Sequence, residues 1–166
     1  MNGVYIEISL RLQQLYLFEP APDSDILLRQ YPVSTALNGA GEANGSYCTP
    51  RGRHRITEKI GAGAPLFAAF TSRVPTGEIW TAQRDAEEPG RDWILTRILW
   101  LEGMEPGKNQ GGEVDSHARY IYIHGTHEEH RIGTPVSHGC IRMKNADVAA
   151  LFELVEVGTQ VNISEG

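Results

Sequence analysis

Residues 120–125 read Tyr-Ile-Tyr-Ile-His-Gly, and residues 137–142 read Ser-His-Gly-Cys-Ile-Arg. The first stretch has two isoleucines in alternation, which predicts a strand that ends at His124. The second places Cys140 directly after a glycine, which permits a tight turn. The segment between the two stretches is long enough to fold back and bring His124 to Cys140.

This arrangement of residue types is typical of a thiol nucleophile with a histidine base. A cysteine thiol has a pKa near 8.5, and a neighbouring imidazolium can lower that pKa by several units and leave a thiolate–imidazolium pair. A turn at Gly139 can also direct consecutive backbone N–H groups toward a developing oxyanion. We therefore predict a cysteine acyl-transfer enzyme with Cys140 as nucleophile and His124 as base.

The composition excludes several other classes. The 166 residues fit one domain, residues 1–166, and the net charge of −6 gives no basic footprint for a nucleic-acid partner. No apolar window approaches the ~18 residues that a membrane-spanning helix needs. The two cysteines, Cys48 and Cys140, are too few for a disulfide scaffold. One bridge could join them, but it would inactivate Cys140; Cys48 otherwise looks incidental.

The remaining pattern predicts a mostly β domain. Apolar and polar residues alternate over short segments separated by Gly, Pro and Asn turns. The predicted strands are residues 5–10, 13–18, 26–33, 54–59, 66–70, 77–81, 94–101, 119–124 and 159–163. Two polar loops, 102–118 and 125–136, are alternative candidates for a lid over the site.

One C-terminal helix is predicted to pack on the strands. Apolar residues recur at helical spacing from Val148 to Val155, which favours one buried face. Asn145 is a suitable N-cap residue, and Gly158 is placed to end the helix.

The same motifs resemble the L,D-transpeptidase catalytic domain, also called the YkuD-type domain. That family carries a histidine, a loop and then a Ser/Thr-His-Gly-Cys run, as at His124 and 137–140 here. Thr-Pro-Arg-Gly at 49–52 is similar to the family's Thr-Pro-x-Gly turn, and 92–97 is similar to a segment of its Gram-negative members. The resemblance covers nearly the whole chain and implies a YkuD-type β-sandwich or barrel-like fold.

The resemblance also implies roles for single residues. The Gly125 carbonyl would orient the His124 imidazole, and the N–H groups of His138, Gly139 and Cys140 would line the oxyanion hole. The His138 ring would support the site. No cofactor or metal is implied.

Three further residues are predicted to contact substrate. Arg142, where many members have asparagine, could bind a substrate carboxylate or could cap local carbonyls. Ser137 is expected to form the turn rather than to act as nucleophile. Tyr122, on the same strand face as Tyr120 and His124, could line the cleft or pack on the sheet.

The implied substrate is a peptidoglycan tetrapeptide stem or muropeptide. Cys140 would attack the carbonyl at the L-centre of the third residue and release the terminal D-alanine, leaving a thioester. An amine acceptor then gives a crosslink or an exchanged D-amino acid, whereas water gives carboxypeptidase activity.

The N-terminus, residues 1–7, lacks the features of a secretory signal. If Met1 is the native start, we expect a cytoplasmic L,D-carboxypeptidase of murein recycling; a trimmed chain would be periplasmic.

Two alternatives remain open. His124, His127, His130, His138 and Cys140 are residue types that bind zinc, although spacing along a loop carries little geometric meaning. The chain could also be a non-catalytic domain that binds wall peptides without cutting them. An intact nucleophile, base and glycine turn argue against pure binding.

Overall fold

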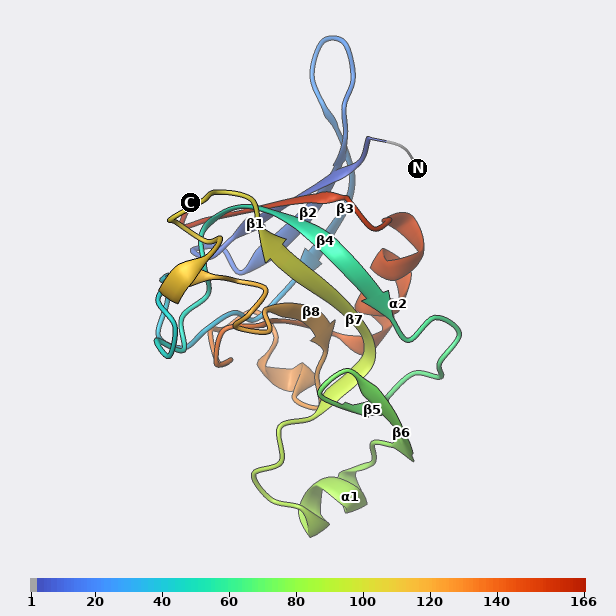
Figure 1. Cartoon of the computed structure of the whole chain (residues 1–166). Coiled ribbons are helices and arrows are strands. Elements are labelled where there is room, and N and C mark those ends of the chain that lie inside the picture. The colour runs from blue at the N-terminus through green and yellow to red at the C-terminus, as the bar shows by residue number, and fades with distance from the viewer. Residues whose placement is uncertain (1–2) are drawn as a thin grey trace.

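A computed structural model describes residues 3–166, and ten strands form one mixed sheet in this part of the chain. Figure 1 shows the loop after β2 projecting from one end of the molecule and α1 lying at the opposite end. The strands are β1 (Tyr5–Ser9), β2 (Gln14–Glu19), β3 (Ile26–Pro32), β4 (Gly52–Ile60), β5 (Ala68–Thr71), β6 (Val74–Ile79), β7 (Ile94–Gly103), β8 (Tyr122–Gly125), β9 (Ile141–Met143) and β10 (Gln160–Ser164). The helices are α1 (Ala82–Glu87) and α2 (Asn145–Leu154), with two 3-10 turns, η1 (Gly112–Val114) and η2 (Glu129–Arg131).

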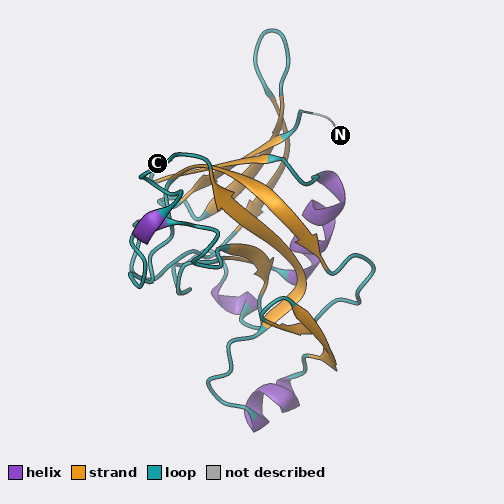
Figure 2. Ribbon diagram, viewed as in Figure 1, coloured by secondary structure: helices purple, strands orange, loops and turns teal. Residues whose placement is uncertain are grey.

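The sheet order is β3-β2-β1-β10-β4-β7-β5-β6, and β8 and β9 branch from β7. Two pairs, β1 with β10 and β8 with β9, are parallel, and the others are antiparallel. Strands and loops account for most of the chain (Figure 2). The prediction of a mostly β domain with one longer helix packed on it is confirmed.

The predicted alternation sets the burial of the strands. In β1, Ile6 and Ile8 are fully buried while Tyr5 and Glu7 are half-buried, as expected for a sheet with one face on the core. The central strand β7 is buried along almost its whole length. The main core lies between these strands and α2, whose Val148 and Leu151 are completely buried.

Strand β7 carries a bulge that matters for the site. Its pairing with β8 shifts register between Leu95 and Ile98, and Thr96 within this shift has a positive φ of 72°. Bulges redirect side chains and are frequent next to active sites. Here the Thr96 hydroxyl donates to Asn145 Oδ1 at 2.5 Å, so the bulge joins β7 to the start of α2.

The ends of α2 differ from the sequence prediction. Lys144, not Asn145, is the N-cap residue, and the Asn145 N–H donates to the Glu129 carboxylate at 2.7 Å. Asn145 is instead completely buried. The helix ends at Leu154 rather than near Gly158, and its C-cap residue Val155 has an extended backbone. Lys59 Nζ donates to the Phe152 and Val155 carbonyls at this end, at 2.6 and 2.8 Å.

The elements α1 and β9, like the two 3-10 turns, were not predicted. The helix α1 follows Thr81, whose hydroxyl accepts the Arg84 N–H at 3.1 Å, a standard N-cap; the sequence pattern predicts only a strand that ends at Thr81. The three-residue strand β9 is too short to show any periodicity. Strands β5 and β6 also lie a few residues from their predicted bounds.

Candidate active site

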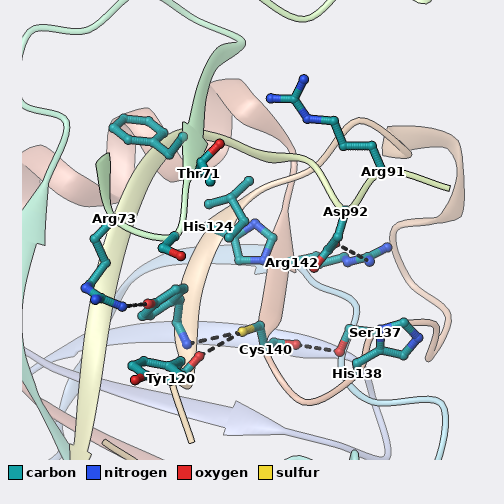
Figure 3. A pocket seen from close by; sticks show the side chains of 14 residues that line it. Thr71, Arg73, Arg91, Asp92, Tyr120, His124, Ser137, His138, Cys140 and Arg142 are labelled. Atoms are coloured by element: carbon teal, nitrogen blue, oxygen red, sulfur yellow. Dashed lines mark hydrogen bonds and ion pairs between the residues drawn. The ribbon is translucent and has the colours of Figure 1, made fainter. Parts of the chain in front are cut away.

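One cavity of about 550 Å³ brings the predicted histidine and cysteine together (Figure 3). Its walls come from the β5–β6 hairpin, the segment before β7, and the strands β8 and β9 with the turn before β9. The lining residues are Phe70, Thr71, Ser72, Arg73, Arg91, Asp92, Ile94, Tyr120, Tyr122, His124, Ser137, His138, Cys140 and Arg142.

The register of β8 on β9 explains why these side chains converge. His124 lies opposite Arg142 in a parallel pair, and Ile123 lies opposite Ile141. Because side chains alternate along a strand, Tyr122 and His124 share one face with the neighbouring Arg142. Cys140 directly precedes β9, and its sulfur accepts the Tyr122 N–H at 3.4 Å. The prediction that the intervening loop returns Cys140 to His124 therefore agrees with the fold.

The His124 imidazole is buried and oriented by one backbone carbonyl. Its Nδ1 donates to the Gly125 oxygen at 2.7 Å, as the sequence analysis expected. Since a carbonyl only accepts, Nδ1 carries the proton and Nε2 is left as an acceptor. The ring lines the cavity beside Cys140 (Figure 3), so Nε2 is the nitrogen available to take a proton.

Gly125 has a second role, in packing. A Cβ atom at this position would overlap the Asn145 amide and come within 2.7 Å of the Leu95 carbonyl oxygen. The Asn145 amide donates to the Thr126 oxygen at 2.8 Å and to Glu129 at 2.9 Å. Asn145 therefore fixes the chain that leaves the catalytic strand β8, a function that its predicted cap role did not include.

The turn before Cys140 is held by Ser137. Its hydroxyl donates to the Cys140 oxygen at 2.6 Å and accepts the Gly139 N–H at 3.2 Å. This supports the expected turn-forming role, but it corrects two other expectations. The Ser137 hydroxyl is already used within the turn and is not free for substrate, and the Gly139 N–H is not free for an oxyanion.

The remaining N–H groups of the turn are available. Within residues 3–166, those of His138 and Cys140 have no hydrogen-bond acceptor, and they are the oxyanion-hole donors that this turn offers. Gly139 has a φ of +134°, and a Cβ there would lie 3.2 Å from the Cys48 oxygen, so glycine is required for conformation and space.

Thr49 of the Thr-Pro-x-Gly segment holds the turn before Cys140 through hydrogen bonds. It is completely buried, and its hydroxyl donates to the Gly139 oxygen at 2.9 Å and accepts the Ala36 N–H at 3.0 Å. The Thr-Pro-x-Gly motif, which the sequence offers only as a family resemblance, thus has a physical role. It holds the peptide directly before Cys140.

We expect Thr49→Val to loosen this turn while filling the same space. A buried carbonyl and a buried N–H would each lose a partner, and each loss costs about 1–3 kcal/mol in free energy of unfolding. Urea denaturation measures this loss, and substrate turnover should fall with it. Thr49→Ser, which keeps the hydroxyl, is the control. Equal stability of the valine and serine variants would contradict the role given to the hydroxyl.

The electrostatics favour a neutral thiol beside a neutral imidazole. Burial raises the pKa of the Cys140 thiol to about 11 and lowers the pKa of His124. The thiol also donates to the Tyr120 oxygen at 3.3 Å, and a thiolate would face that carbonyl without a proton between them. The thiolate–imidazolium pair predicted from the sequence is therefore not the resting state of this geometry.

Alkylation of Cys140 should report this protonation state. Because burial raises the pKa of this thiol to about 11, the reactive thiolate fraction at pH 7 is roughly 10²-fold smaller than for an unperturbed thiol. We expect iodoacetamide to modify Cys140 slowly at pH 7 and about tenfold faster for each pH unit toward 10. Peptide mass spectrometry of a Cys48→Ser protein measures the rate. Fast, pH-independent modification from pH 5 upward would indicate a resting thiolate.

The other predicted contact residues all line the cavity but differ in availability. Arg142 donates to Glu128 at 3.0 Å and to Asp92 at 3.4 Å, so it neither caps carbonyls nor offers an unpaired charge. The His138 ring lies edge-on to Tyr47, with centroids 5.7 Å apart. The Tyr122 hydroxyl accepts from Arg73 at 3.0 Å.

Several cavity residues were missed by the sequence analysis. Neither candidate lid, 102–118 or 125–136, lines the cavity; the β5–β6 hairpin with Arg73 and the 91–94 segment do. Asp92 begins the segment noted for its family resemblance. No local pattern marks Arg73 as a site residue, because only the pairing of β5 with β7 brings its hairpin here.

The alternative zinc site gains no support from the described residues. In the range 3–166, no three His, Cys, Asp or Glu side chains are grouped so that they could hold a metal ion. Both cysteines are free thiols. No helix in that range is long and apolar enough to cross a membrane.

Comparisons with known proteins agree with this geometry. The family model for the YkuD L,D-transpeptidase catalytic domain matches residues 3–163. The chain is 49% identical over 158 residues to "Probable L,D-transpeptidase YcfS" of Escherichia coli (strain K12), covering 95% of this chain and 43% of that protein.

Solved structures share the fold at low sequence identity. Bd1075 of Bdellovibrio bacteriovorus aligns with a TM-score of 0.61 and 14% identity, over 98% of this chain and 48% of that one. The LD transpeptidase LdtMt1, in complex with imipenem, aligns with a TM-score of 0.55 and 18% identity, over 98% and 59%. This chain spans less than two thirds of each of these three proteins.

Fold and site together define an enzyme class with a cysteine nucleophile. The chain belongs to the L,D-transpeptidase family, through its YkuD catalytic domain.

Proposed function

We propose that this protein cleaves the bond between the third residue and the terminal D-alanine of a peptidoglycan tetrapeptide stem, with water as the main acceptor. The observation that carries the chemistry is the shared cavity of Cys140 and His124, with Nδ1 of the histidine fixed on Gly125 and Nε2 left free. Family membership supports a peptidoglycan peptide as substrate.

The reaction follows from these groups in two steps. The Cys140 sulfur attacks the carbonyl carbon at the L-centre while its proton passes to His124 Nε2. The C–N bond breaks, the proton goes to the departing D-alanine amine, and a thioester remains. Water then attacks the thioester, gives a proton to His124 and releases the tripeptide acid, and the sulfur regains its proton. Each attack forms a tetrahedral intermediate with a negatively charged oxygen, and the N–H groups of His138 and Cys140 stabilise that oxyanion in both steps.

The size of a second cavity beside Cys140 supports water, rather than the amine of a second stem peptide, as the acceptor. A smaller cavity of about 290 Å³ reaches Cys140 from the side of Tyr47 and Arg119. Pockets that hold drug-sized ligands measure about 300–1,000 Å³. The smaller cavity lies at the lower end of this range, which favours water over a bulky peptide acceptor. Crosslinking or D-amino-acid exchange, the transferase outcome that the names of relatives suggest, remains the second candidate.

Incubation with a defined tetrapeptide tests both substrate and outcome. We expect tripeptide and free D-alanine as the main products by liquid chromatography and mass spectrometry. A crosslinked dimer would contradict hydrolysis, as would exchanged tetrapeptide formed in excess D-methionine. The Cys140→Ala protein is the control for contaminating peptidases.

We also propose a setting, which is the recycling of soluble muropeptides in the cytoplasm. Trimming D-alanine is the useful reaction there, because no polymeric wall is present to crosslink. Fractionation of cells that express the full-length protein tests the location. Recovery in the periplasm would overturn this part of the proposal without affecting the reaction.

A further inference from the structure

Three arginines line the catalytic cavity, and two of them are already neutralised. Arg142 pairs with Glu128 and Asp92, at 3.0 and 3.4 Å. Arg91 pairs with Glu78 and Glu88, both at 2.9 Å. The charges of these two side chains are therefore compensated before any substrate enters.

Arg73 differs from both. It lies in the turn between β5 and β6, and within residues 3–166 it forms no ion pair; its one side-chain hydrogen bond in that range is to the Tyr122 hydroxyl, at 3.0 Å. The guanidinium is held over the rings of Trp100 and Tyr120, 4.7 and 5.1 Å from their centroids. Aromatic faces fix its orientation but leave its remaining N–H donors free.

Arg73 and the Cys140 nucleophile line the same cavity. Tyr122 lies between them, because its backbone N–H contacts the Cys140 sulfur and its hydroxyl, at the far end of the side chain, contacts Arg73. Figure 3 shows Arg73 at one side of the cavity and the sulfur near its middle. The carboxylate of a C-terminal residue lies only about one residue, ~3.8 Å, beyond the bond that is cut.

We propose that Arg73 binds the terminal carboxylate of the leaving D-amino acid and so selects free C-terminal residues for cleavage. A planar guanidinium matches a carboxylate with two parallel hydrogen bonds. The inference deepens the proposed function and rests on it. The other source of the same chemistry is a side-chain carboxylate on the third stem residue, as in a diaminopimelate stem.

Binding to the inactive Cys140→Ala protein tests this assignment without turnover. Three peptides are titrated by calorimetry: the tetrapeptide, its C-terminal amide, and the tetrapeptide with lysine as third residue. The acid should bind about 10- to 100-fold more tightly than the amide, the range expected for hydrogen bonds to a charged group. Adding Arg73→Gln should remove this preference, and Arg73→Lys should restore part of it. Arg84→Gln, on α1 outside the cavity lining, is the matched control.

Other outcomes overturn the assignment. If Arg73→Gln weakens the acid and the amide equally, the residue supports the cavity wall only. If it removes only the difference between the diaminopimelate and lysine peptides, Arg73 reads the side-chain carboxylate instead. No preference for the acid in the parent protein also counts against it. The proposed function is tested separately, by the products that the active enzyme forms. Tight acid-selective binding without release of D-alanine would contradict that function but would still support Arg73 as a carboxylate-binding residue.

Discussion

Replacement of Cys140 by alanine is expected to lower D-alanine release by at least about 10⁴-fold, the largest effect of any single substitution in this protein. Within residues 3–166, this sulfur is the only cysteine thiol that lines the cavity. Ser137 is the nearest alternative in the turn, and its hydroxyl is bound to the Cys140 oxygen at 2.6 Å. The loss of activity is measured as the rate of D-alanine release in a coupled oxidase assay.

The second cysteine supplies the control for this prediction. Cys48 does not line the cavity, so Cys48→Ser should retain most of the activity. Circular dichroism and thermal melting of the alanine variant should match the parent protein, because the change removes one half-buried atom. Substantial D-alanine release by a folded Cys140→Ala protein would show that another group attacks the substrate.

His124→Ala should have the second-largest effect, a loss of about 10²–10⁴ in kcat/KM. In the parent protein, burial lowers the pKa of His124 below its usual 6.5, so the imidazole is neutral and able to accept a proton throughout the neutral range. Activity should therefore stay level near pH 7 and fall only as the pH drops through this lowered pKa. The variant should lose that acid limb and instead gain activity as hydroxide ionises the thiol.

A second histidine, His130, supplies the control for the His124→Ala prediction. His130 lies in η2 and outside the cavity lining, so His130→Ala should keep both the rate and the pH profile. Alkylation of Cys140 at pH 10 should remain possible in His124→Ala, which would show that the nucleophile is still accessible. An unchanged acid limb in His124→Ala would assign that limb to another group.

The sequence predicted the parts of this molecule that depend on local pattern. Alternation in residues 5–10 marked β1, and helical spacing from Val148 marked α2. The His124 and Cys140 pair was found because a strand, a loop and a glycine turn constrain the path of the chain over a short separation. Parallel pairing of β8 with β9 then completed that path.

Features that depend on distant segments could not be predicted in the same way. The pairing of β5 with β7 brings Arg73 to the cavity. Asn145 is buried, and its side chain forms hydrogen bonds with Thr96 and Glu129. Its cap-like residue type gave the opposite expectation. Burial also favours a neutral Cys140 thiol, the opposite of the thiolate predicted from the sequence, because burial outweighs the attraction that a nearby imidazolium would give.

The central claim is that Cys140 becomes acylated by a stem-peptide carbonyl. Intact-protein mass spectrometry after incubation with imipenem, followed by peptide mapping, tests it most directly, with tetrapeptide added as competitor. We predict a single adduct on Cys140 that tetrapeptide slows and that Cys140→Ala lacks. An adduct on another residue, or modification of Cys140 that excess tetrapeptide leaves unchanged, would contradict the account.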